Sequence, residues 1–340
     1  MDIKEEYKKQ ITAAGHAWNE NGRKITNKLI ELFGSADFTI AFLPYKKSMW
    51  NCMESVFEEC KAAGANVHVM PIPYWRMKEK MNPDFIDSDF DAFGPIAENV
   101  RNLQAINPDF LVVHYPFDNH NKVTQMLPEF HLKNLKSKYP KAKLIYIPYY
   151  IATGKGGMPI RQGIQFCDLI FLHTEWERDS FISEWENVGI DFRGRVFAFG
   201  SPKVDAAFKA CDHADLPTEW QQALKDLPVT LILNSLESYL VDPFARIETY
   251  KQNITRETNK GHAVIFRLHP LLKTTIKAMW PESEPAFDRF IKEIRKIPHV
   301  VVDESEELER AIGIADYLIS DKSSVVPMWQ ATGKPFALML

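Results

Sequence analysis

The stretch Ala315-Asp316-Tyr317-Leu318-Ile319-Ser320-Asp321-Lys322-Ser323-Ser324 decides how the fold is interpreted, because an apolar run of strand length leads directly into a polar turn. Residues 317–319 predict a buried strand, and the aspartate and serines that follow are residue types that cap a helix. The free N–H groups at the start of a helix, together with its dipole, favour anions. The stretch therefore predicts a phosphate site built by Asp321, Lys322, Ser323 and Ser324, with a plain helix cap as the alternative.

A second strand-to-turn unit, residues 264–270, lies about fifty residues upstream and ends in a cation and an imidazole. Its apolar run leads into Arg267 and His269, and the proline that follows is placed to stop the strand. Two such strand ends side by side would hold a diphosphate. The alternative is a solvated turn, with Arg267 paired to a surface carboxylate. Asn234 and Ser235 follow a further predicted strand and are expected to contact the nucleotide or its phosphates.

Short apolar runs alternate with helical stretches along most of the chain from residue 38 onward. Alternation of this kind predicts an α/β fold with parallel sheets covered by helices, in which ligands bind at the carboxyl ends of the strands. The predicted strands cover residues 39–43, 67–72, 110–114, 144–147, 169–172, 196–199, 229–233, 263–268, 300–302, 317–319 and 335–339.

The chain is predicted to have an N-terminal helical segment (1–35) and two Rossmann-like domains (36–200 and 201–340). Spaced apolar residues before Gly34 predict one or two amphipathic helices in the first segment. The domain boundary is placed at Gly200-Ser201-Pro202-Lys203, because the sequence from there to about residue 228 is polar and is expected to be poor in helix.

Composition argues for a folded protein of two domains. Hydrophobic residues make up 45% of the 340, and a formal net charge of -4 argues against nucleic acid as the main partner. Four scattered cysteines without a C-x-x-C pair signal neither a zinc site nor a disulfide framework. A charged start and the lack of an apolar run of about twenty residues favour the cytoplasm, with peripheral association at the inner membrane face left open.

Several motifs together resemble the CDP-glycerol glycerophosphotransferases, the teichoic acid polymerase family. The resemblance implies a GT-B fold, in which two Rossmann-like domains with parallel sheets face a cleft. The C-terminal domain is expected to be truncated, because the chain stops at Leu340 in an apolar strand. The resemblance covers about residues 38–340 and rests on Arg-x-His-Pro at 267–270, Ser-Asp-x-Ser-Ser at 320–324, and the segments 42–46, 48–50, 71–74, 114–118 and 146–149.

The resemblance also implies a transferase reaction, in which an acceptor hydroxyl attacks the β-phosphorus of CDP-glycerol or a related CDP-alcohol and releases CMP. The acceptor would be a cell-surface glycan, a teichoic-acid-like polymer or a lipid-linked precursor. His269 would stabilise charge on the leaving CMP, and Lys322 stands where the family usually carries an aromatic residue. Neither a metal nor another cofactor is expected, because GT-B enzymes generally use helix starts and basic side chains instead. Donor contacts are implied for Arg267, Asp321, Lys322, Ser323 and Ser324.

The general base is less well defined, because the family's Trp-His-Gly is replaced here by Ile147-Pro148-Tyr149. His114, at the end of a predicted strand, is the expected replacement, since an unperturbed histidine suits proton transfer near neutral pH. Asp118 would orient it. A purely structural role for His114 is the alternative, and His120 and His173 are weaker candidates.

Five residues that follow predicted strands are expected on the acceptor side. Two of them lie in the glycine-rich stretch 149–157, which is not a Walker A motif. It is predicted to form an acceptor-side lid, with an ordinary loop as the alternative. Two rival functions stay open: a GT-B glycosyltransferase that uses a nucleotide sugar, and a catalytically decayed family member that binds nucleotides without turnover. The acceptor-side residues are Lys46, Ser48, Asp118, Tyr149 and Lys155.

Overall fold

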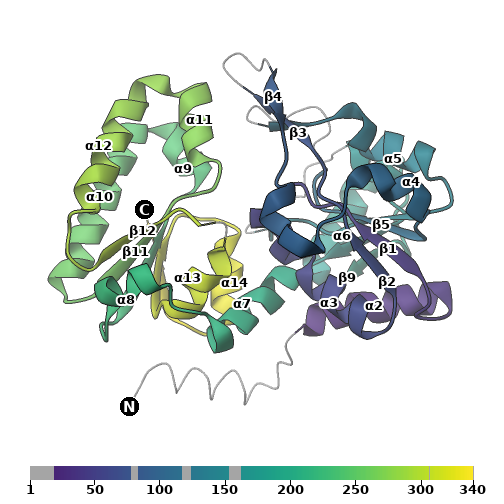
Figure 1. Cartoon of the computed structure of the whole chain (residues 1–340), viewed down its shortest axis with the longest axis horizontal. Coiled ribbons are helices and arrows are strands. Elements are labelled where there is room, and N and C mark those ends of the chain that lie inside the picture. Colours follow the sequence, from purple (N-terminus) through teal and green to yellow (C-terminus); the bar gives the residue numbers. More distant parts are fainter. Residues whose placement is uncertain (1–18, 78–82, 117–123, 153–161, 306, 340) are drawn as a thin grey trace. The chain divides into compact units, whose positions relative to one another are not determined.

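The computed structural model describes residues 19–77, 83–116, 124–152, 162–305 and 307–339. The described chain forms two compact units, an N-terminal unit that ends at Ala206 and a C-terminal unit that begins at Ala207. Each unit contains a parallel sheet with helices around it (Figure 1). The predicted α/β class is therefore confirmed.

The large sheet of the N-terminal unit has the strand order β2-β1-β5-β7-β8-β9 in the described residues, and all its pairs are parallel. The first strand of this sheet along the chain is β1. Strand β2 pairs on one side of it, and β5 and the later strands follow on the other, so the direction in which strands are added reverses between β1 and β5. Each strand predicted for this half is present with slightly different ends. The strands are β1 (Thr39–Phe42), β2 (Asn66–Val69), β5 (Phe110–Val113), β7 (Lys143–Tyr146), β8 (Leu169–Leu172) and β9 (Val196–Ala198).

Each face of this sheet carries its own core, because alternate strand residues point to opposite sides. Ile40 and Phe42 pack with α2 and α3 on one face. Ala41 and Leu43 pack with α5 and α6 on the other. Gly34, with φ 93°, ends α2 as predicted. The helices of this unit are α2 (Glu20–Phe33), α3 (Glu54–Ala62), α4 (Leu103–Ile106), α5 (Leu132–Lys138) and α6 (Glu175–Glu186), with short 3-10 helices at Lys47–Cys52, Phe90–Ile96, Val100–Asn102, Pro128–Phe130 and Gln162–Phe166.

A small antiparallel sheet in the N-terminal unit was not predicted. Its order in the described residues is β4-β3-β6, and its strands are inserted after β2 and after β5. Strands of three to five residues with mixed polarity give no clear period, and their pairing is decided by residues distant in sequence. The strands are β3 (Tyr74–Met77), β4 (Pro83–Asp87) and β6 (Thr124–Met126).

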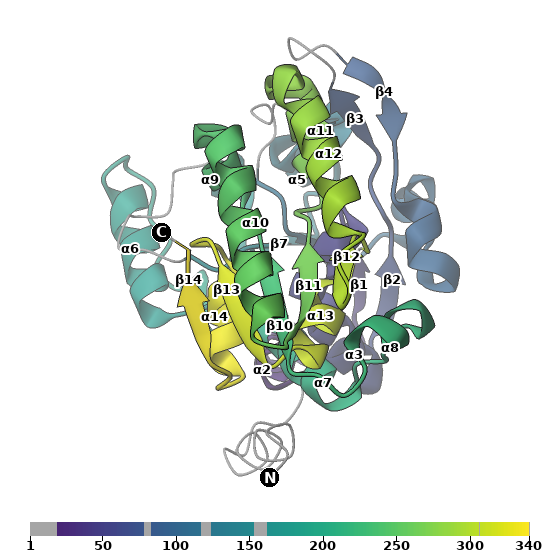
Figure 2. The ribbon, with the colours of Figure 1, turned by 90° about the vertical axis from the view of Figure 1, so that its left-hand side faces the viewer.

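The parallel sheet of the C-terminal unit has the order β12-β11-β10-β13-β14 within the described residues. Its first strand along the chain lies in the middle, and the order reverses between β10 and β13. Helices α10 (Pro243–Asn259) and α12 (Glu284–Ile294) lie on one face of this sheet, and α13 (Leu308–Ile314) and α14 (Val325–Ala331) lie on the other (Figure 2). The strands are β10 (Val229–Leu233), β11 (Ala263–Arg267), β12 (Val300–Asp303), β13 (Tyr317–Ser320) and β14 (Phe336–Leu338).

The segment from residue 200 to about 228 was expected to be poor in helix, and this expectation is wrong. Helix α7 (Pro202–His213) carries the chain from one unit into the other, and α8 (Thr218–Leu224) follows it. Polar residues misled the prediction, because Lys203 and Asp205 are themselves buried. The remaining helices are α9 (Leu236–Val241), α10 (Pro243–Asn259), α11 (Leu272–Met279), α12 (Glu284–Ile294), α13 (Leu308–Ile314) and α14 (Val325–Ala331), with a 3-10 turn at Pro281–Ser283.

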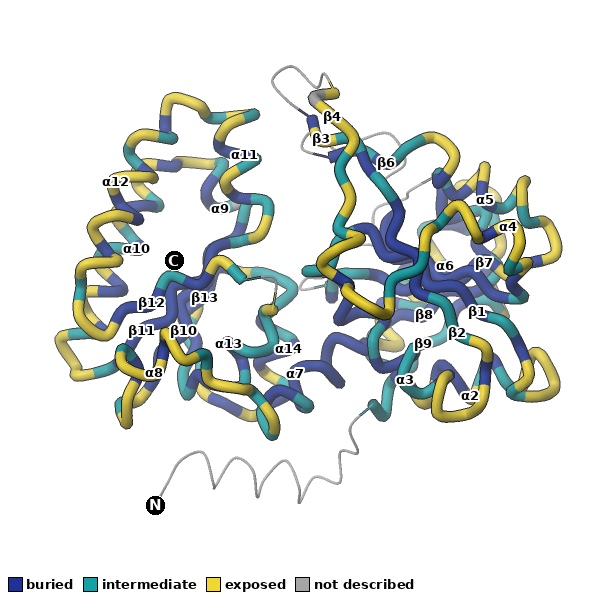
Figure 3. Tube along the Cα trace, viewed as in Figure 1, coloured by how far each residue is buried: buried dark blue, intermediate teal, exposed yellow. Residues whose placement is uncertain are grey.

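Burial follows the sheets in both units. The central strands of each sheet are buried along their length, whereas the outward faces of the helices are exposed (Figure 3). None of the helices in the described parts of the chain is both long and apolar enough to cross a membrane.

Candidate functional site

The reversal of strand order between β10 and β13 marks the place in the C-terminal unit where a ligand is expected. Asn234 and Ser235 directly follow β10, and Asp321 directly follows β13. The backbone N–H of Ser235 donates to the Asp321 carboxylate at 2.8 Å, which joins the two strand ends. The structure thus brings together these three residues, which the sequence placed in the site separately.

Asp321 organises this edge of the sheet. Its side chain is buried, and besides Ser235 it accepts hydrogen bonds from Arg246 Nη1 at 2.9 Å and from the Tyr250 hydroxyl at 3.4 Å. Burial, with a smaller contribution from the Asp321 charge, raises the pKa of Tyr250, so this hydroxyl stays protonated and can donate. Asp321 therefore holds other groups in place.

Arg246 is the site residue that sequence reasoning missed. It lies in the first turn of α10, and its side chain is 18% exposed. One guanidinium nitrogen bonds to Asp321, and the others bond to no other described residue. A cation in the first turn of a helix interacts unfavourably with the helix dipole. This placement is the signal from which Arg246 could have been found in the sequence. The remaining guanidinium donors are of the kind that bind anions.

Asn234 and His269 lie at the same edge of the sheet as Asp321, after β10 and β11. The Asn234 side-chain oxygen accepts the His269 backbone N–H at 2.8 Å, whereas its amide nitrogen is buried with no hydrogen-bond partner in the described structure. His269 Nδ1 accepts the Leu271 N–H at 3.1 Å, so we assign the proton of the neutral ring to Nε2. The two side chains follow the adjacent strands β10 and β11. The sequence had instead predicted the ends of β11 and β13 side by side, and this is wrong, because β10 lies between these two strands and pairs with both.

The Arg267 side chain does not lie where a contact to the donor phosphates, its predicted role, requires it. It is 3% exposed, and its guanidinium pairs with Asp303, its neighbour on β12, and donates to the Ser305 carbonyl at 2.9 Å. These contacts tie β11 to β12. They argue for a structural role, because a guanidinium engaged inside the sheet has few donors left for a phosphate.

The turn after Asp321 holds fewer of its polar side chains in place than the predicted phosphate site requires. Lys322 is exposed, and the Ser323 hydroxyl accepts the Val325 N–H at 3.3 Å. Ser324 precedes α14, but its side chain makes no capping hydrogen bond. This leaves the Ser324 hydroxyl and the lysine for an approaching phosphate, while α14 itself has only seven residues.

His114, the expected base, occupies the corresponding reversal point of the N-terminal sheet, between β1 and β5. The Tyr45 backbone N–H donates to its Nε2 at 2.7 Å, and the ring is fully buried. Burial, and to a smaller degree the charge of Lys203, lowers the pKa of His114 to about 3. These facts argue against His114 as the base, because its lone pair is already used and substrate cannot reach it.

The described residues predicted for the acceptor side lie in two places in the N-terminal unit. Lys46 contacts the Tyr74 hydroxyl and lies 3.4 Å from Asp89, and Ser48 sits in the next 3-10 helix. Tyr149 is held through its carbonyl, which accepts the Lys203 ammonium at 2.9 Å. Asp118, His120 and Lys155 lie outside the described residues.

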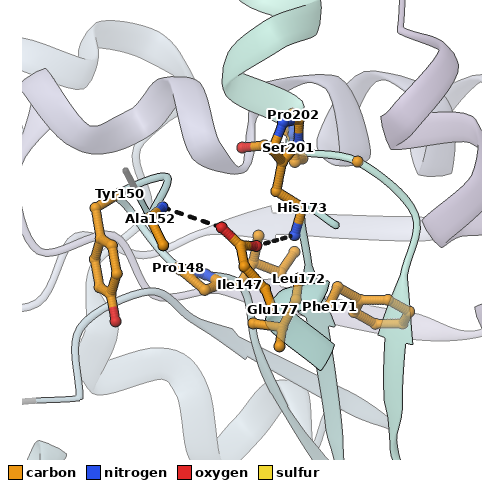
Figure 4. Close-up of a pocket in the computed structure, with 11 residues that line it drawn as sticks. Ile147, Pro148, Tyr150, Ala152, Phe171, Leu172, His173, Glu177, Ser201 and Pro202 are labelled. Atoms are coloured by element: carbon orange, nitrogen blue, oxygen red, sulfur yellow. Dashed lines mark hydrogen bonds between the residues drawn. The ribbon is translucent and has the colours of Figure 1, made fainter. Parts of the chain in front are cut away.

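A recess opens in the N-terminal unit at the carboxyl ends of β7, β8 and β9 (Figure 4). Its lining includes Pro148 and Tyr150, the two sequence neighbours of Tyr149. Glu177 is one of the residues that line it. The Glu177 carboxylate accepts backbone N–H groups from Ala152 at 3.1 Å, His173 at 2.8 Å and Thr174 at 3.2 Å. The carboxylate thus fixes the residues after β7 to the turn between β8 and α6.

Metal-binding side chains do not gather anywhere in the described residues, since no group of three among His, Cys, Asp and Glu could hold an ion. The expectation that no metal is needed remains a prediction for the chelator experiment given in the Discussion.

Comparison with solved structures defines the class of fold. The UDP-GlcNAc 2-epimerase of Methanocaldococcus jannaschii, in complex with UDP-GlcNAc and UDP, is matched with a TM-score of 0.57 at 12% identity, over 88% of this chain and 83% of that one. The enzyme from Neisseria meningitidis bound to UDP-GlcNAc gives 0.57 at 13% identity, over 88% and 82%. The chain therefore has the GT-B-type α/β architecture, as predicted.

The comparisons do not establish the particular family. The wall teichoic acid polymerase TagF is matched over 98% of this chain and 77% of its own at 12% identity, but its TM-score of 0.46 is too low to carry an argument. No family model matches the sequence. No curated protein matches it either.

Proposed function

We propose that the protein transfers glycerol phosphate, or a related polyol phosphate, from a CDP-alcohol to a hydroxyl of a cell-surface glycan, a teichoic-acid-like polymer or a lipid-linked precursor, and releases CMP. The donor would bind at the carboxyl edge of the C-terminal sheet. One observation carries the proposal: at the point where the strand order reverses, Asp321 binds both the Arg246 guanidinium and the backbone of Ser235, which directly follows Asn234 and its buried amide without a described partner.

The chemistry of this edge matches a diphosphate. Arg246 supplies a charge and several donors, and the Asn234 amide adds a neutral donor for phosphate oxygens. A hydrogen bond to a charged partner contributes about 2 kcal/mol. Loss of the Arg246 guanidinium is thus expected to weaken donor binding about 30-fold, since about 1.4 kcal/mol corresponds to tenfold.

The cytidine base and the polyol come from the resemblance of residues 267–270 and 320–324 to the CDP-glycerol glycerophosphotransferases. In that reaction His269 would stabilise the charge that develops on the leaving CMP. The resemblance also supports a position for the donor phosphates near Lys322, Ser323 and Ser324.

A nucleotide sugar is the second candidate donor. The structures of similar fold include epimerases whose names record UDP-GlcNAc and UDP as ligands. Arg246 and Asn234 would bind the diphosphate of such a donor equally well, because neither contact reads the base.

Isothermal titration of the purified chain with CDP-glycerol, CMP, UDP-glucose and GDP-mannose separates these candidates. We expect selective binding of the cytidine ligands, weakened about 30-fold in Arg246→Gln and measurably in His269→Ala and Ser323→Ala. Arg289→Gln is the matched control, because Arg289 is exposed on α12 in the same unit. Tighter binding of UDP-glucose or GDP-mannose would replace the CDP-alcohol with a nucleotide sugar. Binding without turnover would identify a decayed enzyme, and no binding would reject the donor site.

A further inference from the structure

A concentration of positive charge lies on α5 and on the turn that leads from it into β7, in the N-terminal unit. The whole chain has a formal net charge of -4, yet no aspartate or glutamate occurs between residues 129 and 168. The outward side of α5 is exposed (Figure 3). Four exposed lysines of this segment form what we call the basic surface: Lys133, Lys138, Lys141 and Lys143.

A fifth lysine, Lys136, holds the turn against the helix. Its ammonium donates to the Ala142 carbonyl at 3.0 Å and to the Asp168 carboxylate at 2.6 Å. Ala142 lies between Lys141 and Lys143 in sequence, so this bond keeps both lysines close to α5. The basic surface is therefore one continuous feature of the N-terminal unit, and its backbone is fixed without any ligand.

The basic surface is not neutralised by carboxylates of the described chain. None of its four ammonium groups forms an ion pair with a described residue, whereas Asp168 is already paired with Lys136. The Asp109 carboxylate accepts a backbone N–H of β1 at 2.8 Å. Glu129 precedes α5, at the opposite end of the helix from the turn. Like charges gathered without counter-charges favour the binding of an anion.

The spread of the charges defines the kind of anion. Lys133 and Lys138 are five residues apart on α5, which is a rise of about 7.5 Å along the helix axis. Lys141 and Lys143 follow beyond the end of the helix. One small anion cannot contact all four groups, whereas a chain with repeated negative charges can. Lysine binds phosphate as a point charge on a flexible stem, which suits a chain without a fixed shape.

The basic surface offers no apolar contacts to a ligand. Between residues 128 and 143, all of which are described, no large hydrophobic side chain is exposed, and Leu132 and Leu135 are buried in the core. Helices that bind membranes combine basic residues with an apolar face that enters the bilayer. Charge alone is available here, which favours a hydrophilic polyanion over a lipid surface.

We propose that the basic surface binds the polyol phosphate chain of a polymeric acceptor, with phosphate groups of the chain on its four lysines. The inference rests on the proposed function, and it selects one of the proposed acceptors, the teichoic-acid-like polymer, which carries a negative charge in each repeat. Contacts along the chain add to its affinity. A single glycerol phosphate gains little, because it reaches only one lysine at a time.

Fluorescence anisotropy of a labelled glycerol phosphate polymer tests the basic surface in the full chain at low ionic strength, with no donor present. The test variant combines four substitutions: Lys133→Gln, Lys138→Gln, Lys141→Gln and Lys143→Gln. We expect it to bind the polymer about 15-fold more weakly, at about twofold for each exposed ion pair. Arginine at the same four positions should keep the binding, because the charge is retained. Added salt should weaken binding to the unsubstituted protein.

A control variant of equal charge separates the basic surface from net charge. It removes four exposed lysines on or directly after α11 and α12: Lys273→Gln, Lys277→Gln, Lys292→Gln and Lys296→Gln. We expect this variant to bind the polymer as the unsubstituted protein does. Equal weakening in the two variants, or no binding to the unsubstituted protein, overturns the proposal.

Two competing polyanions complete the experiment. Phosphatidylglycerol vesicles or single-stranded RNA that bind more tightly than the polymer, at equal phosphate concentration, would assign the basic surface to another partner and overturn the proposal. The proposed transfer is tested separately by titration with CDP-glycerol. If the polymer binds at the basic surface but the chain neither binds nor turns over CDP-glycerol, the polymer site stands and the proposed transfer fails.

Discussion

Lowering the pH should destabilise the N-terminal unit through His114. Its folded pKa, about 3, lies below the ordinary value of 6.5 because the ring is buried. Between these two values the unfolded chain binds a proton that the folded chain excludes, so the free energy of unfolding falls as the pH falls. Each pH unit in that window costs about 1.4 kcal/mol, and the change from pH 7 to pH 5 costs about 2 kcal/mol.

The His114→Gln variant isolates this contribution. The substituted glutamine side chain cannot titrate, and its amide oxygen can still accept the Tyr45 N–H that His114 Nε2 accepts. Urea unfolding of both proteins at pH 7 and pH 5 removes any pH-independent cost of the substitution. We expect the variant to lose about 2 kcal/mol less than the unsubstituted protein between the two pH values. Equal losses in the two proteins would refute the assignment of a neutral, buried His114.

Two further predictions rest on contacts away from the donor edge, and a third concerns metal dependence. Asp205→Ala should lower the free energy of unfolding by about 3 kcal/mol in chemical denaturation, because the carboxylate accepts from the backbone N–H groups of Asn21 and Gly22 and from the Ser55 hydroxyl. Its loss leaves the Gly22 and Ser55 donors buried without a partner, and an effect below about 1 kcal/mol would count against this. Gly313→Ala should cost about 1–3 kcal/mol by the same measurement, because an added Cβ would lie 2.2 Å from the carbonyl oxygen of Ala210, and an unchanged midpoint would show that α7 and α13 separate freely. Transfer activity should persist in a chelator, and its loss with recovery on adding magnesium or manganese would contradict the expectation of a metal-free reaction.

The sheet strands were predictable because their signal is local. Residues 229–233 are apolar except for Thr230, and β10 has the same bounds. The strand ends that carry Asn234, His269 and Asp321 could be placed at one edge of one sheet, because all strands of a parallel sheet present the same end there.

The roles of individual side chains were less predictable, because each depends on partners distant in sequence. Arg267 looked like a phosphate ligand until β12 placed Asp303 beside it. Asp321 looked like a helix cap, yet it binds Arg246, 75 residues earlier in the chain. His114 looked like a base because it follows a strand, but the backbone N–H of Tyr45, which comes after β1, donates to its Nε2.

The most direct test of the central claim is a crystal structure of the full chain with CDP-glycerol bound. The account predicts the diphosphate at the reversal point between β10 and β13, with phosphate oxygens within hydrogen-bond distance of the Arg246 guanidinium and the Asn234 amide nitrogen. A donor bound at another place in the C-terminal unit, with Arg246 still facing solvent, would contradict it.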